Sequence, residues 1–202
     1  MNLQCRLCGG LENEVVLDFG PTALANNFLL KDDLADIKSG KIVEPIFNLS
    51  YFLCLDCGAL QLKNAVQPDL LFHNYLYASS QSGNLVKHFK NYVLNLVTEF
   101  NLPHNAFVIE PACNDGVMLK HFRDYGIKTL GVEPAVNLAH ICTRNGFDVI
   151  NYYFGPHVAS QIVSQYGRAD CITFNNVAAH MENIREFFET TRTCLKDDGF
   201  FC

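Results

Sequence analysis

The stretch Phe107-Val-Ile-Glu-Pro-Ala-Cys-Asn-Asp-Gly-Val-Met-Leu119 decides the fold of this chain. Three apolar residues lead into Glu110, a short run of small and polar residues ends at Gly116, and an amphipathic run begins at Val117. A buried strand, a tight turn and a helix in this order place a ligand at the carboxyl end of a parallel strand, facing the N-terminus of a helix. The stretch therefore favours a cofactor-binding enzyme over a plain globular domain.

The residues after this stretch continue the alternation of strand and helix. The apolar runs that predict strands lie at 107–110, 129–133, 147–150, 169–175 and 199–202. The amphipathic runs that predict helices lie at 117–125, 135–144, 156–165 and 184–195. Alternating units of this kind form a parallel sheet with helices on both faces. The last predicted strand is incomplete at Cys202, so we expect this chain to be a fragment of a longer protein.

The residues before this stretch have a different composition. Residues 1–70 hold four cysteines and several turn signals; 15–19 and 46–53 resemble short strands, and 31–40 a polar linker or short helix. Residues 71–82 form an aromatic connector, and 85–100 carry apolar residues at helical spacing. We therefore predict three parts, which span residues 1–70, 71–104 and 105–202.

Two Cys-x-x-Cys pairs, Cys5 with Cys8 and Cys54 with Cys57, are each followed by a glycine. Four thiolates suit a tetrahedral zinc ion, and a closed shell of four cysteines leaves no open position, so the zinc would be structural and not catalytic. Redox-active pairs and buried free thiols are the alternatives. The remaining cysteines are predicted to be small buried apolar residues; they are Cys113, Cys142, Cys171, Cys194 and Cys202.

Charge and hydropathy exclude several classes of protein. The net charge of −6 and the absence of a Lys/Arg cluster argue against nucleic acid as a partner. The first ten residues lack the apolar segment of a signal peptide. No apolar run approaches the roughly 18 residues of a membrane helix. We therefore expect a cytoplasmic protein with no membrane partner; the sequence indicates no particular oligomeric state.

The turn lacks the dinucleotide fingerprint G-x-G-x-x-G and has Glu110, Ala112, Asn114 and Gly116 in its place. Small residues let the backbone approach a ligand, and a carboxylate suits a cationic ligand better than a pyrophosphate. S-adenosylmethionine (SAM) carries a sulfonium and an ammonium group. Glu133 closes the next strand, where an acid can accept hydrogen bonds from ribose hydroxyls. Together these residues favour SAM over a nicotinamide cofactor.

The predicted strand 169–175 leads into Asn175-Asn-Val-Ala-Ala-His180. In this class of sheet, that strand end lies beside the reactive group of the cofactor. His180 is therefore a candidate acid, base or substrate ligand. A structural role for this histidine is the alternative.

These motifs, in this order, resemble the C-methyltransferases that modify nucleotide-activated 4-keto-deoxy sugars. The resemblance covers nearly all of the chain. The matching segments are Cys5-x-x-Cys8-Gly9, Leu17 to Asn26, Cys54-x-x-Cys57-Gly58, Leu71-Phe-x-x-Tyr75-x-Tyr77-x-Ser-Ser80, Glu110-x-Ala-x-Asn-Asp-Gly116, Gly131-Val-Glu-Pro134, Asn175-Asn-Val-x-Ala-His180 and Asp198-Gly-Phe. Pro111 and Ala178 replace residues that are more often aliphatic in the family.

The resemblance implies an N-terminal zinc domain, a Rossmann-like class I SAM-binding core of about five parallel strands, and a C-terminal domain that helps to bind the nucleotide sugar. His180 and Tyr77 would be catalytic, and Cys5, Cys8, Cys54 and Cys57 would bind zinc. The implied cofactor-binding residues are Tyr75, Ser80, Glu110, Ala112, Asn114, Asp115, Gly116, Glu133, Pro134, Phe154 and Asn175.

The implied reaction begins with removal of the proton at C3 of the sugar, which the neighbouring ketone acidifies. The resulting enolate carbon then takes the methyl group of SAM in line. The family's Tyr/His/Glu-rich motif, which supplies the implied base, is not among these 202 residues, so we expect impaired activity. The alternatives are methyl transfer to another small molecule and a non-catalytic fragment that binds zinc and SAM.

Overall fold

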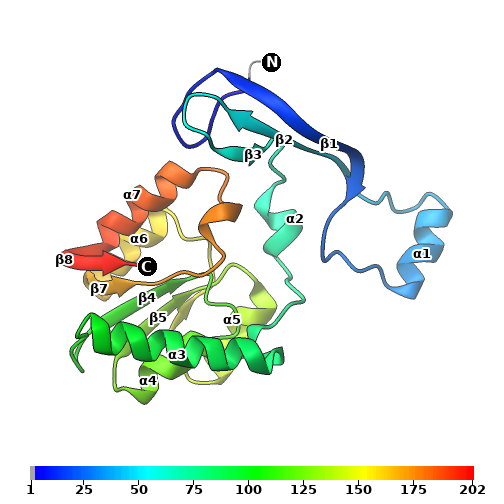
Figure 1. The fold of residues 1–202 in the computed structure, drawn as a ribbon. Helices are drawn as coiled ribbons and strands as arrows, with labels where there is room; N and C mark the ends of the chain where they lie inside the picture. Colours follow the sequence, from blue (N-terminus) through cyan, green and yellow to red (C-terminus); the bar gives the residue numbers. More distant parts are fainter. Residues whose placement is uncertain (1–2) are drawn as a thin grey trace. The chain divides into compact units, whose positions relative to one another are not determined.

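A five-stranded parallel sheet forms the centre of residues 72–202 in the computed structural model, which describes residues 3–202 (Figure 1). The strands lie in the order β6-β5-β4-β7-β8, and each neighbouring pair is parallel. Their bounds are β4 Phe107–Pro111, β5 Lys128–Val132, β6 Val149–Ile150, β7 Ala169–Ile172 and β8 Leu195–Phe201. This order confirms the predicted Rossmann-like core. The order reverses between β4 and β7, which is the place where ligands bind in such sheets.

Helices cover both faces of this sheet (Figure 1). They are α3 Gly83–Glu99, α4 Val117–Asp124, α5 Val136–Arg144, α6 Pro156–Gln165 and α7 Ile184–Cys194. Val108 of β4 packs with α3 and α4, whereas Phe107 and Ile109 pack with α6 on the opposite face. Every residue of β4 is consequently buried, which explains its uninterrupted apolar run. In the described part of the chain, no helix is both long and apolar enough to cross a membrane.

The strand β7 ends at Ile172, three residues before the predicted end of the strand at 175. A short 3-10 helix, η2 Ala178–His180, follows a few residues later. Asn176 adopts a left-handed backbone conformation with φ of 57°, which a strand does not allow. The apolar run therefore predicted the strand correctly but placed its end too late. Thr173 and Phe174 still donate backbone hydrogen bonds to the Ile109 and Cys202 carbonyls, each at 3.0 Å, and the loop follows them.

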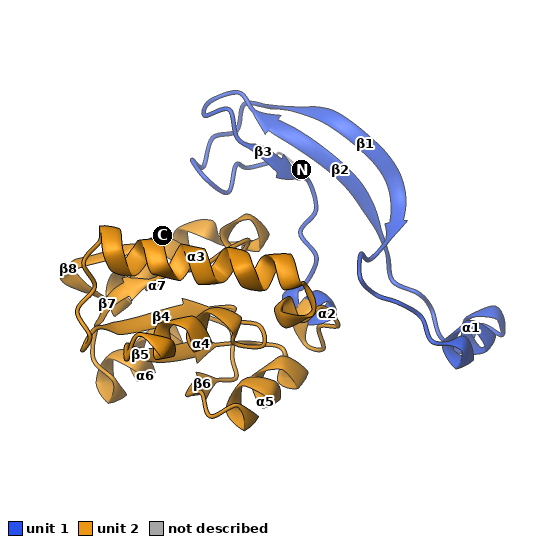
Figure 2. Cartoon of the chain, turned by 60° about the horizontal axis from the view of Figure 1, so that its bottom comes forward, with its two compact units in different colours: residues 1–71 blue, residues 72–202 orange. Residues whose placement is uncertain are grey.

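Residues 1–71 make up the first of two units, and residues 72–202 make up the second (Figure 2). The first unit contains an antiparallel sheet in the order β1-β2-β3. The bounds of its elements are β1 Asn13–Ala23, α1 Lys31–Lys38, β2 Ile46–Cys54 and β3 Leu60–Leu62, and the short helix α2 Pro68–Phe72 spans the boundary with the second unit. The segment 31–40 is thus a helix over most of its length, and its first turn is capped by the Asp33 carboxylate, which accepts a hydrogen bond from the Leu30 N–H at 2.8 Å.

The strand β1 is more than twice as long as the predicted strand 15–19. Its pairing with β2 is interrupted between Val15 and Leu17 and again between Asp18 and Pro21. Gly20 lies in the second interruption with φ of 72°, and its N–H donates to the Asp18 carboxylate at 2.9 Å. These irregularities disturb the simple alternation of side chains, so the sequence pattern detected only the middle of the strand.

Candidate cofactor and zinc sites

The two Cys-x-x-Cys pairs form turns of the same construction. The N–H of Gly9 donates to the Cys5 carbonyl, and the N–H of Gly58 donates to the Cys54 carbonyl, both at 2.9 Å. The two glycines have φ of 78° and 76°, in the left-handed region that glycine adopts without steric cost. This conformation explains why a glycine follows each cysteine pair.

The sulfur atoms of the four cysteines form one cluster in the first unit. All lie within 4.8 Å of one another; Cys5 Sγ is 3.7 Å from Cys57 Sγ, and Cys8 Sγ is 3.6 Å from Cys54 Sγ. Four thiolates around a tetrahedral zinc ion, each at about 2.3 Å, lie about 3.8 Å apart. A disulfide would instead bring two sulfur atoms to about 2.05 Å. The spacing therefore fits zinc and not oxidised cysteine pairs.

The ionisation of these thiols also agrees with the binding of a cation. Burial opposes ionisation of Cys5, but hydrogen bonds that include those from the Cys8 N–H and the Gln61 side chain lower its pKa to about 6. The N–H of Ala59 favours the Cys57 thiolate, yet burial and the neighbouring thiols raise the pKa of Cys57 to about 12. The cluster thus favours a thiolate at one cysteine and resists a second. A bound divalent cation would stabilise all four thiolates.

The turn that follows β4 contains alternating left-handed residues. Ala112 and Asn114 have φ of 53°, and Gly116 has φ of 83° as the residue before α4. A Cβ at Gly116 would lie 3.0 Å from Cys142 Sγ, so a side chain there would be both strained and crowded. The backbone bends as tightly as a glycine-rich loop although only one of these residues is glycine.

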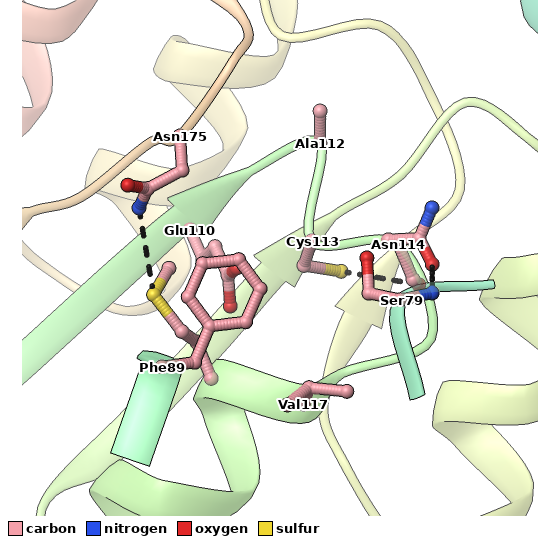
Figure 3. Close-up of a pocket in the computed structure, with 9 residues that line it drawn as sticks. Ser79, Phe89, Glu110, Ala112, Cys113, Asn114, Val117 and Asn175 are labelled. Carbon is pink, nitrogen blue, oxygen red and sulfur yellow. Dashed lines mark hydrogen bonds between the residues drawn. The ribbon is translucent and has the colours of Figure 1, made fainter. Parts of the chain in front are cut away.

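A pocket opens beside this turn at the carboxyl end of β4 (Figure 3). Four of the predicted cofactor-binding residues line it: Glu110, Ala112, Asn114 and Asn175. Five further residues that the sequence did not single out also line it: Ser79, Phe89, Cys113, Val117 and Met118. The signal for most of these was weak, because apolar side chains on a helix look the same whether they face a core or a ligand. Ser79 had the clearest signal, as the neighbour of Ser80.

Glu110 is the most informative residue of the pocket. Its side chain is only 6% exposed, and its Oε2 atom has no hydrogen-bond partner. Burial raises the pKa of Glu110 well above its ordinary value, nearby acidic groups add to the rise, and the N–H of Leu119 opposes it. A buried carboxyl oxygen without a partner is costly unless a ligand satisfies it. The ammonium group of SAM can donate a hydrogen bond to such an oxygen, and its sulfonium group can attract the carboxylate electrostatically.

Glu133 does not line the pocket, and its carboxylate contacts the backbone. One oxygen accepts from the Asn114 N–H and the other from the Ala135 N–H, each at 2.8 Å. Burial raises the pKa of Glu133 to about 7, although both N–H groups favour the ionised form. Each oxygen keeps a lone pair for a ribose hydroxyl. The glutamate also joins the turn to the start of α5, a role that sequence reasoning missed.

The aromatic connector lies against the same turn. Asn114 accepts a hydrogen bond from the Ser79 N–H at 2.8 Å and donates to the Tyr77 carbonyl at 3.0 Å. Asp115 accepts from the Ser80 N–H at 3.1 Å. The structure thus brings the predicted residues Tyr77, Ser80, Asn114 and Asp115 together. The contacts involve the backbone of the connector and the side chains of the turn.

The two candidate proton-transfer residues lie on segments whose neighbours line the pocket. His180 is exposed on η2, five residues after Asn175, and Tyr77 lies two residues before Ser79. The His180 ring meets the edge of Phe72 at 6.3 Å between centroids, and Phe72 contacts Tyr75 at 5.8 Å. A row of aromatic side chains therefore links the loop after β7 to the connector.

Two predicted cofactor residues have other surroundings. Phe154 packs on Phe187 of α7, with ring centroids 5.7 Å apart. The carbonyl of Pro134 accepts a hydrogen bond from the Asn151 side chain at 3.1 Å. Neither residue is among those that line the pocket.

Comparison with known families agrees with this geometry. Residues 5–72 match the family described as "Putative zinc binding domain", and residues 85–202 match the family described as "Methyltransferase domain". This chain belongs to the methyltransferase domain family. The zinc-binding match begins at Cys5 and includes all four clustered cysteines.

Known relatives resemble this methyltransferase-domain chain to different extents. It is 31% identical to the C-methyltransferase NovU of Streptomyces niveus over 198 residues, which are 98% of this chain and 46% of NovU. The chain therefore spans slightly less than half the length of this curated relative. The crystal structure of the PH0226 protein from Pyrococcus horikoshii OT3 is similar in fold, with a TM-score of 0.50, 19% identity, and coverage of 67% of this chain and 63% of that chain.

The family matches, the fold and the cysteine cluster together support the two cofactors expected from the sequence, SAM and structural zinc. Glu110 and the turn 112–116 are the residues of this chain that suit SAM. Cys5, Cys8, Cys54 and Cys57 are those that suit zinc.

Proposed function

We propose that the protein methylates a carbon atom of a nucleotide-activated 4-keto-deoxy sugar. The observation that carries the proposal is the buried Glu110 carboxyl with an unpartnered oxygen in a pocket at the end of β4, within a methyltransferase domain. The similarity to a C-methyltransferase supports carbon as the methyl acceptor. The resemblance of the quoted motifs supports the sugar as the substrate class.

Bound SAM supplies an electrophilic methyl group on a sulfonium. The buried carboxylate of Glu110 would hold the cationic part of SAM, because a charge-assisted hydrogen bond is strongest where water is excluded. The turn 112–116 would place backbone next to the ligand without bulky side chains. Glu133 would accept ribose hydroxyls while its backbone hydrogen bonds keep the turn in place.

His180 and Tyr77 are the proposed proton-transfer residues of this chain. The imidazole of His180 has a ring contact to Phe72 that restricts its orientation without using its nitrogen atoms. Those nitrogens can accept the acidic C3 proton of the sugar or hydrogen-bond to its ketone oxygen. Tyr77 is 44% exposed, and its backbone is fixed by Asn114, so its hydroxyl can reach a substrate.

The nine cysteines are all free thiols, which is typical of a reducing compartment, so a cytoplasmic location is part of this proposal. The four that cluster would hold a zinc ion that takes no part in the reaction, because a closed shell of four thiolates leaves the metal no position for a substrate.

Two measurements test the proposal. Calorimetry with SAM and with NAD should show binding of SAM alone, and preferential binding of NAD would contradict the choice of cofactor. Incubation with SAM and a panel of acceptors should then yield a methylated 4-keto sugar, detected by mass spectrometry. Methylation of another acceptor, with none of the sugar, would refute the substrate class. SAM binding without methylation of any acceptor would favour a non-catalytic chain.

A further inference from the structure

Residues 73–80, here called the strap, lie against the turn 112–116. We propose that Asn114 and Asn137 are positioning residues that hold this strap in place, and that how well the strap is ordered sets the affinity for the cofactor. The inference rests on the proposed function in one respect only, the identity of the ligand. The strap and its contacts are features of the described structure.

Asn137 in the first turn of α5 holds the strap at its first tyrosine. Its Oδ1 accepts from the Tyr75 N–H at 3.1 Å, and its Nδ2 donates to the Tyr75 carbonyl at 2.8 Å. The N–H of the preceding Val136 donates to the His73 carbonyl at 3.1 Å. A side-chain amide offers one acceptor and two donors, so it can pair with both polar groups of one residue as a neighbouring strand would.

Asn114 makes the same kind of contact at the other end of the strap. Its Oδ1 accepts from the Ser79 N–H at 2.8 Å (Figure 3). Its Nδ2 donates to the Tyr77 carbonyl at 3.0 Å. Its Oδ1 also accepts from the Asp115 N–H at 2.9 Å. The amide of Asn114 is therefore engaged with protein. We therefore assign this side chain to the strap and not to direct binding of the cofactor.

The strap has little apolar packing of its own. Ala78 is its one buried residue, and Leu76 is 54% exposed. A segment with few buried apolar contacts opens easily unless its backbone is held by hydrogen bonds. The groups that hold this backbone come from the turn and from α5, and Ser79 of the strap lines the pocket. The two asparagines thus connect the order of the strap to the shape of the pocket.

A loosened strap should weaken cofactor binding because the ligand would then have to order the strap when it binds. The test compares wild type with Asn137→Ala, since Asn137 does not line the pocket. Asn95→Ala, an exposed asparagine of α3, is the matched control. S-adenosylhomocysteine is the ligand, with affinity measured by calorimetry. Chymotrypsin cleavage after Tyr75 and Tyr77 reports the order of the strap without any ligand.

Asn137→Ala should bind S-adenosylhomocysteine about five- to tenfold more weakly, near the lower limit of what the net loss of two hydrogen bonds can produce. Its strap should be cleaved faster, and the ligand should protect it. Asn137→Asp keeps the oxygen that accepts from the Tyr75 N–H, but it replaces the donor Nδ2 with a second oxygen, which cannot donate to the Tyr75 carbonyl. This variant should therefore not restore the affinity. Asn95→Ala should match wild type in both measurements. Circular dichroism melting establishes that each variant is folded.

The double variant Asn114→Ala/Asn137→Ala distinguishes a shared strap from two separate structural effects. If both asparagines act through the strap, the loss of affinity in the double variant is smaller than the sum of the single losses in free energy. Fully additive losses, unchanged cleavage at the two tyrosines, or unchanged affinity in Asn137→Ala would each overturn the inference. A wild-type chain that binds no S-adenosylhomocysteine would overturn the proposed function instead, and ligand-free cleavage would then decide whether the asparagines hold the strap.

Discussion

Substitution of Glu110 by Gln should separate cofactor affinity from stability. The side chain is 6% exposed, one oxygen lacks a partner, and burial raises the pKa of the carboxyl well above its ordinary value, which favours the neutral form. Gln has the same shape and no charge. We therefore expect the free energy of unfolding near pH 7 to change by less than about 1 kcal/mol, as for an isosteric replacement in a buried site.

The effect on binding should be much larger. A hydrogen bond to a charged group contributes about 1.5 to 3 kcal/mol. Because about 1.4 kcal/mol corresponds to a factor of ten, Glu110→Gln should weaken SAM binding by roughly tenfold to a hundredfold. The loss should be smaller for S-adenosylhomocysteine, which has no positive sulfur atom.

The pH dependence follows from the raised pKa of Glu110. A cation favours the ionised carboxylate, so SAM binding should release a proton from Glu110. Affinity should then increase as the pH rises toward the pKa of the free carboxyl and level off above it. Glu110→Gln removes this titration, so its affinity should depend less on pH than that of wild type.

Calorimetry in two buffers of different ionisation enthalpy measures both the affinity and the number of protons released. Wild type should release more protons than Glu110→Gln when SAM binds. Equal affinities and equal proton release in the two proteins would refute the role assigned to Glu110. A loss of several kcal/mol in stability would refute the argument that burial favours the neutral form of this carboxyl.

Three further predictions concern metal, packing and pH. A strong chelator should remove about one zinc per chain and unfold residues 3–71, because the only large fully buried side chain in this range is that of Phe52. The amide protons of β4 should stay protected from exchange, and Cys54→Ser should have the same effects as the chelator. A metal-free first unit that keeps its fold would contradict this prediction. Gly131→Ala should destabilise by roughly 1 to 3 kcal/mol in thermal unfolding, because its Cβ would lie 2.5 Å from Cys113 Sγ, and Gly155→Ala, which meets nothing within 4 Å, is the control. Since burial raises the pKa of Glu133 from 4.5 to about 7, the ligand-free second unit should lose stability as pH rises through that range, and a flat profile of amide exchange in β4 would argue against it.

Local patterns in the sequence predicted most of the second unit. The run from Phe107 to Leu119 contains a complete strand, turn and helix, and each is determined by neighbouring residues. The cysteine pairs were equally clear, because their spacing and following glycines are set by the geometry of the turns themselves. The class of ligand could be predicted only from Glu110, Glu133 and the small residues of the turn together, because an acid at the end of a strand is by itself often a cap or a solvated residue.

The remaining features depend on residues distant in sequence. Tyr75 and Asn137 are 62 positions apart, and nothing in either segment indicates that they form paired hydrogen bonds. Glu133 was predicted to face ribose, but its contact with the Asn114 N–H depends on how the turn bends across the sheet edge. The assignment of Phe154 to the cofactor stays a prediction, and the contact of its ring with Phe187, between α7 and the residues before α6, has no signal in the sequence.

The absence of the glycine fingerprint has a physical reason in Asn114. This position needs a left-handed backbone, which glycine adopts most easily and asparagine tolerates better than most residues. A glycine would therefore satisfy the backbone, but it would lose both hydrogen bonds to the strap. Asparagine is the common residue that accepts this conformation and also carries a donor and an acceptor on a short side chain. Asparagine at this position thus adopts the left-handed backbone less easily than glycine would, but it connects the cofactor pocket directly to the segment that bears Tyr75 and Tyr77.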